Sequence, residues 1–184
     1  QRGKARTLVE VMAGPAIAGA RTRLQCCPTG EGAAAAIIVS EDALWKLGVN
    51  ASRAIRVRSS VSRSERLYEA GCDPDTELTR ETLAMACSEA GVAPNQLDVV
   101  EFHDAFSIEE LLYVEALGLC GEGESARLLK EGAFNIGGQC AVSPSGGLLG
   151  MGHPIGPTGV GQVCEVVRQL RGEAGSRQQP NARL

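Results

Sequence analysis

The stretch that decides the fold is Leu97-Asp98-Val99-Val100-Glu101-Phe102-His103-Asp104-Ala105-Phe106, followed at once by Ser107-Ile108-Glu109-Glu110. The apolar residues of 97–102 predict a buried strand, and the serine with two glutamates predicts a helix that runs to about Leu117. His103 is therefore placed at the carboxyl end of a strand, facing the start of a helix. In α/β proteins ligands and catalytic residues gather at such positions.

The second of only two histidines, His153, lies in a glycine-rich loop. Residues 147–159 read Gly-Leu-Leu-Gly-Met-Gly-His-Pro-Ile-Gly-Pro-Thr-Gly, and the glycines allow the backbone to approach a ligand closely. Valines at 160, 163 and 167 share one face and so predict a helix. Because this helix follows His153 directly, its N-terminus points toward His153. This setting favours neutral imidazole, which can act as a base or as an oxyanion donor.

Each histidine also has a structural interpretation. His153 could be a turn residue that bonds to backbone, with glycines needed only for tight packing. His103 could pack while Asp104 caps the next helix, although the Asp104 carboxylate could equally orient a catalytic loop or ring.

Composition narrows the class of protein. The 184 residues are 43% hydrophobic but only 3% aromatic, and the 23 glycines favour an α/β interior built from small aliphatic side chains. The net charge of −4 gives no basic field for nucleic acid. The seven cysteines lack CxxC pairs and the two histidines match no zinc spacing, so we expect reduced thiols, a cytoplasmic location and no metal site. An apolar run near 18 residues is also lacking, so we expect no membrane span.

Further elements are predicted along the chain. Gly32–Ser40 is an apolar run typical of a strand buried on both faces, and 54–61 alternates like a strand with one polar face. Helices are predicted from Ser40 to Leu47, from Thr79 to Gly91 and up to Arg171, with a short helix or a loop over 126–132 and a loop over 62–78. The last dozen residues lack a closing strand, so we expect a chain that is incomplete at both ends.

Several motifs in this order resemble the thiolase superfamily. They are Leu24-Gln25-Cys26-Cys27-Pro28-Thr29-Gly30-Glu31-Gly32, His103-Asp104-Ala105-Phe106, Glu115-Ala116-Leu117-Gly118-Leu119-Cys120, Pro144-Ser145-Gly146-Gly147, Gly152-His153-Pro154-Ile155-Gly156 and Gln169-Leu170-Arg171-Gly172-Glu173-Ala174-Gly175. Within the superfamily the chain is most similar to the sterol carrier protein x type, also called lipid-transfer thiolases.

The resemblance implies a thiolase-like fold, a mixed β-sheet layered with helices and built from two βαβαβαββ halves. Residues 1–50 would end the N-terminal thiolase domain, and residues 51–184 would form the C-terminal domain without its final strands. The acylated cysteine of thiolases would lie upstream of Gln1 and a further catalytic loop downstream of Leu184. We therefore expect the chain alone to be inactive.

The resemblance also implies roles for individual residues. His153 would activate the nucleophilic cysteine and help to bind the thioester oxygen, while His103 would complete an oxyanion hole, often through water. Substrate-binding positions would be Asp104, Phe106, Ser145, Gly146, Gly147 and Gly152. Members of this branch commonly carry a cysteine after His-Asp as the second acid/base, whereas this chain has Ala105. Either a segment outside the chain supplies that cysteine, or Claisen chemistry is lost.

The function implied is that of an acyl-CoA C-acyltransferase, which cleaves or condenses acyl-CoA thioesters. Coenzyme A would be a substrate, no cofactor would be permanently bound, and the partner would be a second copy or an acyl-CoA-binding protein. One alternative is a retro-aldolase on steroid or branched side-chain CoA thioesters. Another is a noncatalytic thiolase-like binding subunit.

Overall fold

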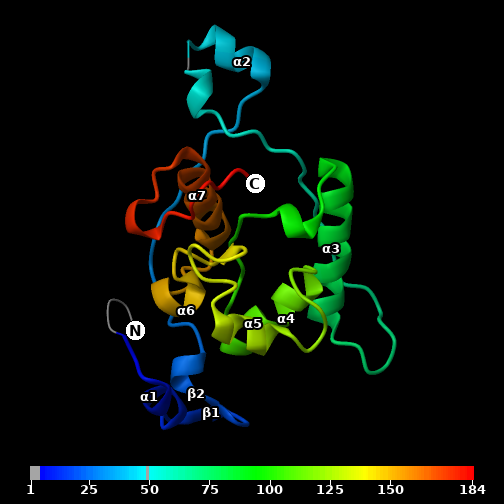
Figure 1. Cartoon of the computed structure of the whole chain (residues 1–184), viewed down its shortest axis with the longest axis vertical. Helices are drawn as coiled ribbons and strands as arrows, with labels where there is room; N and C mark the ends of the chain where they lie inside the picture. Colours follow the sequence, from blue (N-terminus) through cyan, green and yellow to red (C-terminus); the bar gives the residue numbers. More distant parts are fainter. Residues whose placement is uncertain (1–4, 49) are drawn as a thin grey trace.

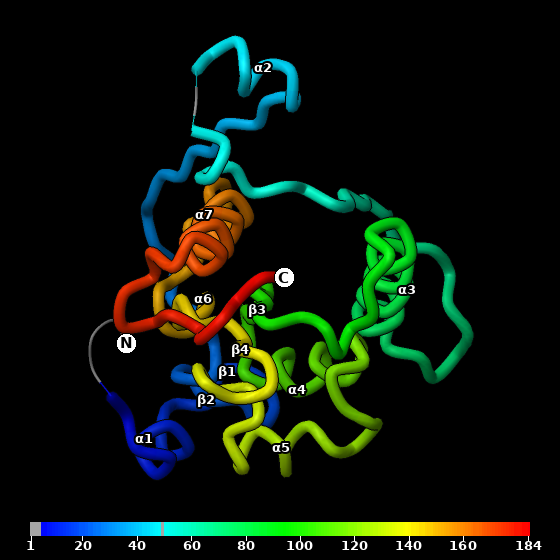
Figure 2. The backbone as a smooth tube through the Cα atoms, turned by 45° about the horizontal axis from the view of Figure 1, so that its top comes forward, coloured from blue at the N-terminus to red at the C-terminus, as the bar shows by residue number. Residues whose placement is uncertain are grey.

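A computed structural model describes residues 5–48 and 50–184. At its centre two short strands, β3 (Val99–Val100) and β4 (Ala141–Val142), pair in parallel, with Val99 opposite Ala141 and Val100 opposite Val142. Helix α7 (Thr158–Arg171) lies on one side of this pair, and α4 (Ser107–Ala116) and α5 (Ser125–Glu131) lie on the other (Figures 1 and 2). Helix α3 (Pro74–Ala90) packs against α4. The mixed α/β class predicted from the sequence is confirmed.

The hydrophobic core lies between β3, β4, α4 and α5. Val114 is fully buried and Phe134 is only 3% exposed, while the ring of Phe102 meets that of Tyr113 edge to face with centroids 5.8 Å apart. The buried cluster consists of Phe102, Val114, Leu117, Leu119, Phe134, Cys140 and Val142. This core fixes the direction in which β3 delivers the chain to His103.

Most predicted helices are confirmed. Helix α2 (Glu41–Lys46) begins after Ser40, whose hydroxyl accepts the Ala43 N–H at 3.2 Å. Helices α4 and α5 occupy their predicted ranges, and α7 ends at Gly172 in the left-handed conformation that glycine adopts without a Cβ clash. A further short helix, α6 (Gly147–Met151), precedes His153. In the described part of the chain no helix is both long and apolar enough to cross a membrane.

The predicted loop over 62–78 is wrong in its last five residues, because α3 begins at Pro74. Asp73 caps this helix through its carboxylate, which accepts the Thr76 N–H at 3.2 Å. Proline at the first helical position leaves no N–H without a partner there. The helix ends at Gly91 as predicted.

The predicted strands over 32–40 and 54–61 are not formed in the described structure. Both segments are extended but unpaired, and they lead out to α2 and back from it (Figure 2). Ile37 and Ile38 are 92% and 84% exposed, which contradicts burial on both faces. A strand needs a neighbour for its N–H and C=O groups, and no other described segment provides one here. The central sheet is accordingly limited to β3 and β4.

An N-terminal hairpin was not predicted. Helix α1 (Leu8–Met12) is capped by Thr7 and Glu10, which satisfy each other's backbone N–H groups. Strands β1 (Ala16–Ala18) and β2 (Arg21–Thr22) follow and pair antiparallel. Single 3-10 turns occur at η1 (Arg23–Gln25), η2 (Ala51–Arg53), η3 (Pro94–Gln96) and η4 (Gly175–Arg177).

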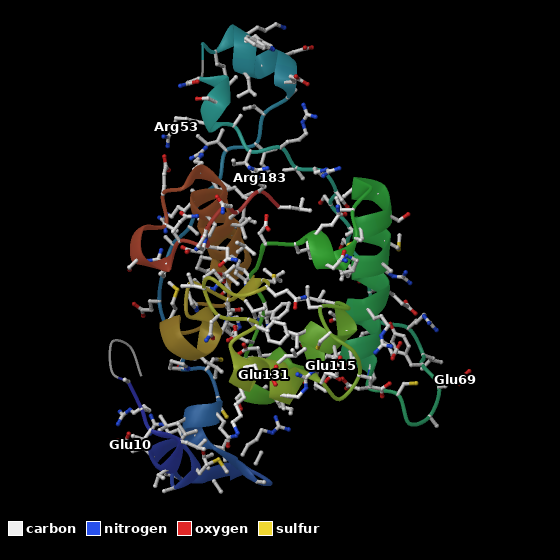
Figure 3. The ribbon with its side chains drawn as sticks, in the orientation of Figure 1. Glu10, Arg53, Glu69, Glu115, Glu131 and Arg183 are labelled. Atoms are coloured by element: carbon white, nitrogen blue, oxygen red, sulfur yellow. The ribbon has the colours of Figure 1, made fainter. Side chains whose placement is uncertain are left out.

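Two contacts fasten the outer segments to the centre. Arg53, labelled in Figure 3, forms an ion pair of 2.6 Å with Glu173 beyond the end of α7. The N–H groups of Arg183 and Leu184 donate to the Asp98 carboxylate at 2.7 and 3.1 Å, and the Asp98 N–H donates to the Leu184 carbonyl at 2.8 Å. Residues 183–184 therefore lie beside the start of β3.

We predict that Phe134→Ala lowers the free energy of unfolding by about 3 kcal/mol or more, because truncation of a buried phenylalanine leaves a cavity in the core. Chemical denaturation followed by circular dichroism measures this change.

Ile37→Ala provides the matched control. We expect it to change the free energy of unfolding by less than about 0.5 kcal/mol, since the side chain lies in solvent. A loss comparable to that of Phe134→Ala would mean that the 32–40 segment is packed as a strand.

Candidate active site

The two histidines, fifty residues apart in the sequence, meet in the structure. Their Nε2 atoms are 3.3 Å apart, and the ring centroids are 4.7 Å apart with an angle of 85° between the ring planes. His103 is exposed and His153 is partly buried. One imidazole can donate a hydrogen bond to the other in this arrangement, while the exposed His103 ring stays accessible to a ligand.

His103 is positioned by the residue before it. Phe102 is buried in the core, its N–H donates to the Ser143 hydroxyl at 3.3 Å, and its carbonyl accepts from the side-chain amide of Gln162 on α7. The backbone is therefore held on both sides of β3 just before it reaches His103. The site is thus built on the strand pair and not on a free loop.

Asp104 points into the protein. It is 3% exposed, and its carboxylate accepts the Leu148 N–H at 2.8 Å at the start of α6. Burial raises the pKa of this carboxyl, and the Leu148 N–H opposes that rise in part. A Cβ on Gly147 would lie 2.2 Å from the Asp104 carboxylate, so only glycine allows this approach. The carboxylate thereby joins the His103 loop to the helix that precedes His153.

Residues 26–29, here called the 26–29 segment, link the two histidine loops. The Cys27 N–H donates to the Ala105 carbonyl, and the His153 N–H donates to the Pro28 carbonyl, both at 2.8 Å. Thr29 pairs with His153 as an isolated parallel bridge. Gly152 has a φ of 96°, and a Cβ there would lie 3.3 Å from the Pro28 carbonyl oxygen. The segment sets the separation of the two loops.

Glu101 is a site residue that the sequence analysis missed. One of its carboxylate oxygens accepts the Ser145 N–H at 3.0 Å and the other accepts the Ser145 hydroxyl at 2.7 Å. The pKa of Glu101 is raised by burial, and the two serine contacts counter this only in part. A glutamate between the two valines of β3 and the apolar Phe102 is the signal that could have revealed it. It holds the Ser145 loop, in which Gly146 is exposed.

Phe106 lies on the other side of the His103 loop. The guanidinium of Arg21 lies 5.1 Å from the centroid of the Phe106 ring. The backbone N–H of Phe106 donates to the Glu109 carboxylate at 3.0 Å. The ring therefore faces the N-terminal hairpin, while its backbone begins α4.

A pocket of about 460 Å³ opens beside the histidine loops. Among the predicted substrate-binding residues, Ser145, Gly147 and Gly152 line it, and Pro154 on the other side of His153 lines it too. Further walls come from residues 28–34 and from α7, along which the lining extends from Thr158 to Arg168. Of the six predicted substrate-binding residues, three therefore line the pocket, Asp104 is buried, Phe106 faces the hairpin and exposed Gly146 is outside the lining. The side chains of the two histidines are not part of the lining either, although their loop neighbours are.

Two cysteines, Cys27 of the 26–29 segment and Cys140 of the core, are poor nucleophiles. Burial raises the pKa of the Cys27 thiol, and the charge of Asp104 raises it further. Burial also raises the pKa of Cys140 to about 12. A nucleophilic cysteine instead needs a lowered pKa. Within the described residues no group of three histidine, cysteine or acidic side chains could hold a metal ion.

Residues 61–184 match the family described as "Thiolase C-terminal domain-like". The chain belongs to the thiolase superfamily. Human "Sterol carrier protein 2" is 44% identical over 97% of this thiolase-type chain and 33% of its own length. The "Benzoylsuccinyl-CoA thiolase subunit BbsB" of Thauera aromatica is 40% identical over 91% of the chain and 43% of its own length. The predicted superfamily and its sterol carrier branch are confirmed.

A solved structure gives the same fold. The "Ltp2-ChsH2(DUF35) aldolase" superposes with a TM-score of 0.51 at 27% identity, covering 59% of this thiolase-type chain and 27% of the solved chain. This chain spans one third to less than one half of the length of the two curated relatives. The proteins to which the chain is similar therefore include one named as a thiolase subunit and one named as an aldolase.

We predict that Gly147→Ala lowers the free energy of unfolding by roughly 2 kcal/mol or more. Gly147 has a φ of 57°, and its new Cβ would overlap the Asp104 carboxylate. Gly150→Ala in the same helix meets nothing within 4 Å and serves as the control. Equal losses in the two variants, measured by denaturation, would contradict the Asp104 contact.

We predict that Glu101→Gln becomes more stabilising relative to wild type as the pH rises from about 4 to about 8. Because the pKa of Glu101 is raised in the folded state, the folded protein holds this proton more tightly than the unfolded chain does. Wild-type stability therefore falls as the pH rises from the ordinary glutamate pKa through the raised one, whereas glutamine does not titrate.

The glutamine amide can keep both contacts to Ser145, since its oxygen accepts the N–H and its NH2 donates to the hydroxyl. Unfolding free energies of both proteins across this pH range measure the effect. A difference that stays constant with pH would show that Glu101 does not titrate as described.

Proposed function

We propose that this chain supplies the histidine half of an acyl-CoA C-acyltransferase of the thiolase type. The complete protein would cleave a 3-oxoacyl-CoA with coenzyme A as second substrate, through a thioester on a cysteine outside this chain. The observation that carries the proposal is the approach of His103 and His153 to 3.3 Å beside a pocket. Membership of the thiolase superfamily supports it.

The proposed reaction assigns His153 as the base. Its Nε2 takes the proton of the cysteine thiol, so the S–H bond breaks and its electron pair stays on sulfur. The thiolate adds to the 3-oxo carbon, and cleavage of the adjacent C–C bond leaves the acyl group on the cysteine and releases the enolate of the shorter acyl-CoA, which takes a proton from a second acid/base. The thiol of coenzyme A then gives its proton to that group, and its sulfur takes the acyl group and displaces the cysteine thiolate, which recovers its proton from His153. His103 and the protonated His153 donate hydrogen bonds to the thioester oxygen as its negative charge grows.

The remaining predicted residues take supporting roles in the proposal. Ser145, Gly146, Gly147 and Gly152 border the path of the acyl-CoA, and Phe106 shapes the far side of the His103 loop. Asp104 acts through the α6 contact instead of touching the substrate, because its carboxylate is buried. The second acid/base comes from outside the chain, since position 105 is alanine.

Partners and location belong to the same proposal. Coenzyme A enters as a substrate, no cofactor stays bound, and the protein works in the cytoplasm as a homodimer or with an acyl-CoA-binding subunit. The relative BbsB is itself named as a subunit, and the solved neighbour is named as a complex with a DUF35 protein. These names support an assembly.

A retro-aldolase is the second candidate. The solved neighbour is named as an aldolase, and Ala105 removes the cysteine that the sterol carrier branch commonly carries there. A retro-aldolase would release a carbonyl compound and a CoA thioester without consuming free coenzyme A.

We predict that His153→Ala lowers kcat/KM for thiolysis by about a hundredfold or more, the usual loss on removal of a general base. The assay follows the disappearance of acetoacetyl-CoA with free coenzyme A, using this chain together with the cysteine-bearing thiolase half. Lys130→Ala is the control, because the Lys130 side chain on α5 is exposed, and this variant is expected to retain full activity.

The outcomes separate the candidates. Coenzyme A-dependent cleavage that survives His153→Ala would remove the assigned base. Carbonyl products formed without consumption of coenzyme A would favour the aldolase, and tight acyl-CoA binding without turnover would favour a noncatalytic subunit. Thiolysis by this chain alone would contradict the proposal that the nucleophilic cysteine lies outside it.

A further inference from the structure

The hydroxyl of Thr158, the first residue of α7, lies between two partners. Its Oγ1 is 2.9 Å from the Pro154 carbonyl oxygen and 2.9 Å from Nδ1 of His153. A carbonyl oxygen only accepts, and a hydroxyl carries a single hydrogen. Two oxygens this close need that hydrogen between them. The hydroxyl therefore donates to Pro154, and its oxygen accepts from His153.

The direction of this bond determines where His153 carries its proton. Nδ1 must hold a hydrogen to donate to Thr158, and in neutral imidazole the other nitrogen then has a free lone pair. That nitrogen, Nε2, faces Nε2 of His103 at 3.3 Å. His103 must therefore carry its own hydrogen on Nε2 and donate it to His153.

We propose that Thr158 is a positioning residue that holds His153 as the Nδ1–H tautomer and so presents the Nε2 lone pair to the active site. The hydrogen bond from the His153 N–H to the Pro28 carbonyl holds the backbone from which this side chain extends. The catalytic meaning of this assignment rests on the proposed function, because the base that accepts a thiol proton must offer an unprotonated nitrogen.

The arrangement also suits the protonated state. When Nε2 takes a proton, both ring nitrogens become donors, and Nδ1 continues to donate to the same Thr158 oxygen. The His153 ring does not have to turn between the two states, but the Nε2–H of His103 must then donate to another acceptor, because two N–H donors cannot bond to each other across 3.3 Å. A partner such as Thr158 keeps the imidazole oriented through the proton transfer.

The tautomer can be measured directly because the chain has only two histidines. Long-range ¹H–¹⁵N correlation on the ¹⁵N-histidine-labelled chain distinguishes protonated from unprotonated ring nitrogens, and His103→Asn assigns the signals. At about pH 8.5, above the ordinary imidazole pKa near 6.5, we expect a protonated Nδ1 and an unprotonated Nε2 on His153. A wild-type spectrum with the hydrogen of His153 on Nε2 would overturn the proposal.

Three variants test the role of the hydroxyl. Thr158→Val keeps the side-chain shape and is expected to lose the protonated signal at Nδ1, while Thr158→Ser is expected to retain it. Thr82→Val is the matched control, because the Thr82 hydroxyl also donates to a carbonyl four residues earlier, at 2.6 Å, but lies on α3. An unchanged His153 spectrum in folded Thr158→Val would overturn the proposal. If that variant does not fold, the wild-type and serine spectra decide.

Kinetics separates this inference from the proposed function. With the cysteine-bearing half present, we expect Thr158→Val to lower kcat for thiolysis by roughly tenfold or more with little change in KM, and Thr158→Ser to restore it. The expected spectra in a protein without thiolysis would refute the proposed function and leave the tautomer assignment intact. Full thiolytic activity in Thr158→Val would refute the positioning role.

Discussion

The buried carboxylate of Asp104 is the contact on which the rest of the site depends. It comes from the chain just beyond β3 and accepts a backbone N–H from Leu148 in α6, 44 residues later. It joins the loop that carries His103 directly to the helix that leads to His153. A side chain so enclosed cannot also serve a ligand, so its purpose here is to fix one loop against the other.

Small residues make this close assembly possible. Gly147 admits the Asp104 carboxylate at a distance that a Cβ would occupy, and Gly152 admits the Pro28 carbonyl at a distance that would be tight for a Cβ. The histidine loops are thus held by backbone packed against backbone and against buried carboxylates. The Glu101 carboxylate holds the Ser145 loop in the same way.

Sequence reasoning located what is encoded locally. Ser40 and Gly172 mark helix ends by their own chemistry, and the two histidines stand out through their loops. It failed where a distant partner decides the outcome. Residues 32–40 have a strand composition, but a strand forms only beside another strand, and the described residues offer none. For the same reason neither the Asp104 contact with Leu148 nor that of Glu101 with Ser145 could be inferred, because sequence spacing does not reveal which backbone groups meet.

The 26–29 segment has a consequence for the order in which the protein folds. The Cys27 N–H donates to the Ala105 carbonyl, and the Pro28 carbonyl accepts from the His153 N–H. These hydrogen bonds connect regions that are widely separated along the chain. Contacts of this kind require large loops to close, which costs entropy and slows their formation relative to helices and neighbouring turns. The core around Val114 uses closer neighbours and can form earlier. We therefore expect the histidine pair to assemble late, so that a partly folded chain would already hold its core before the two histidines meet.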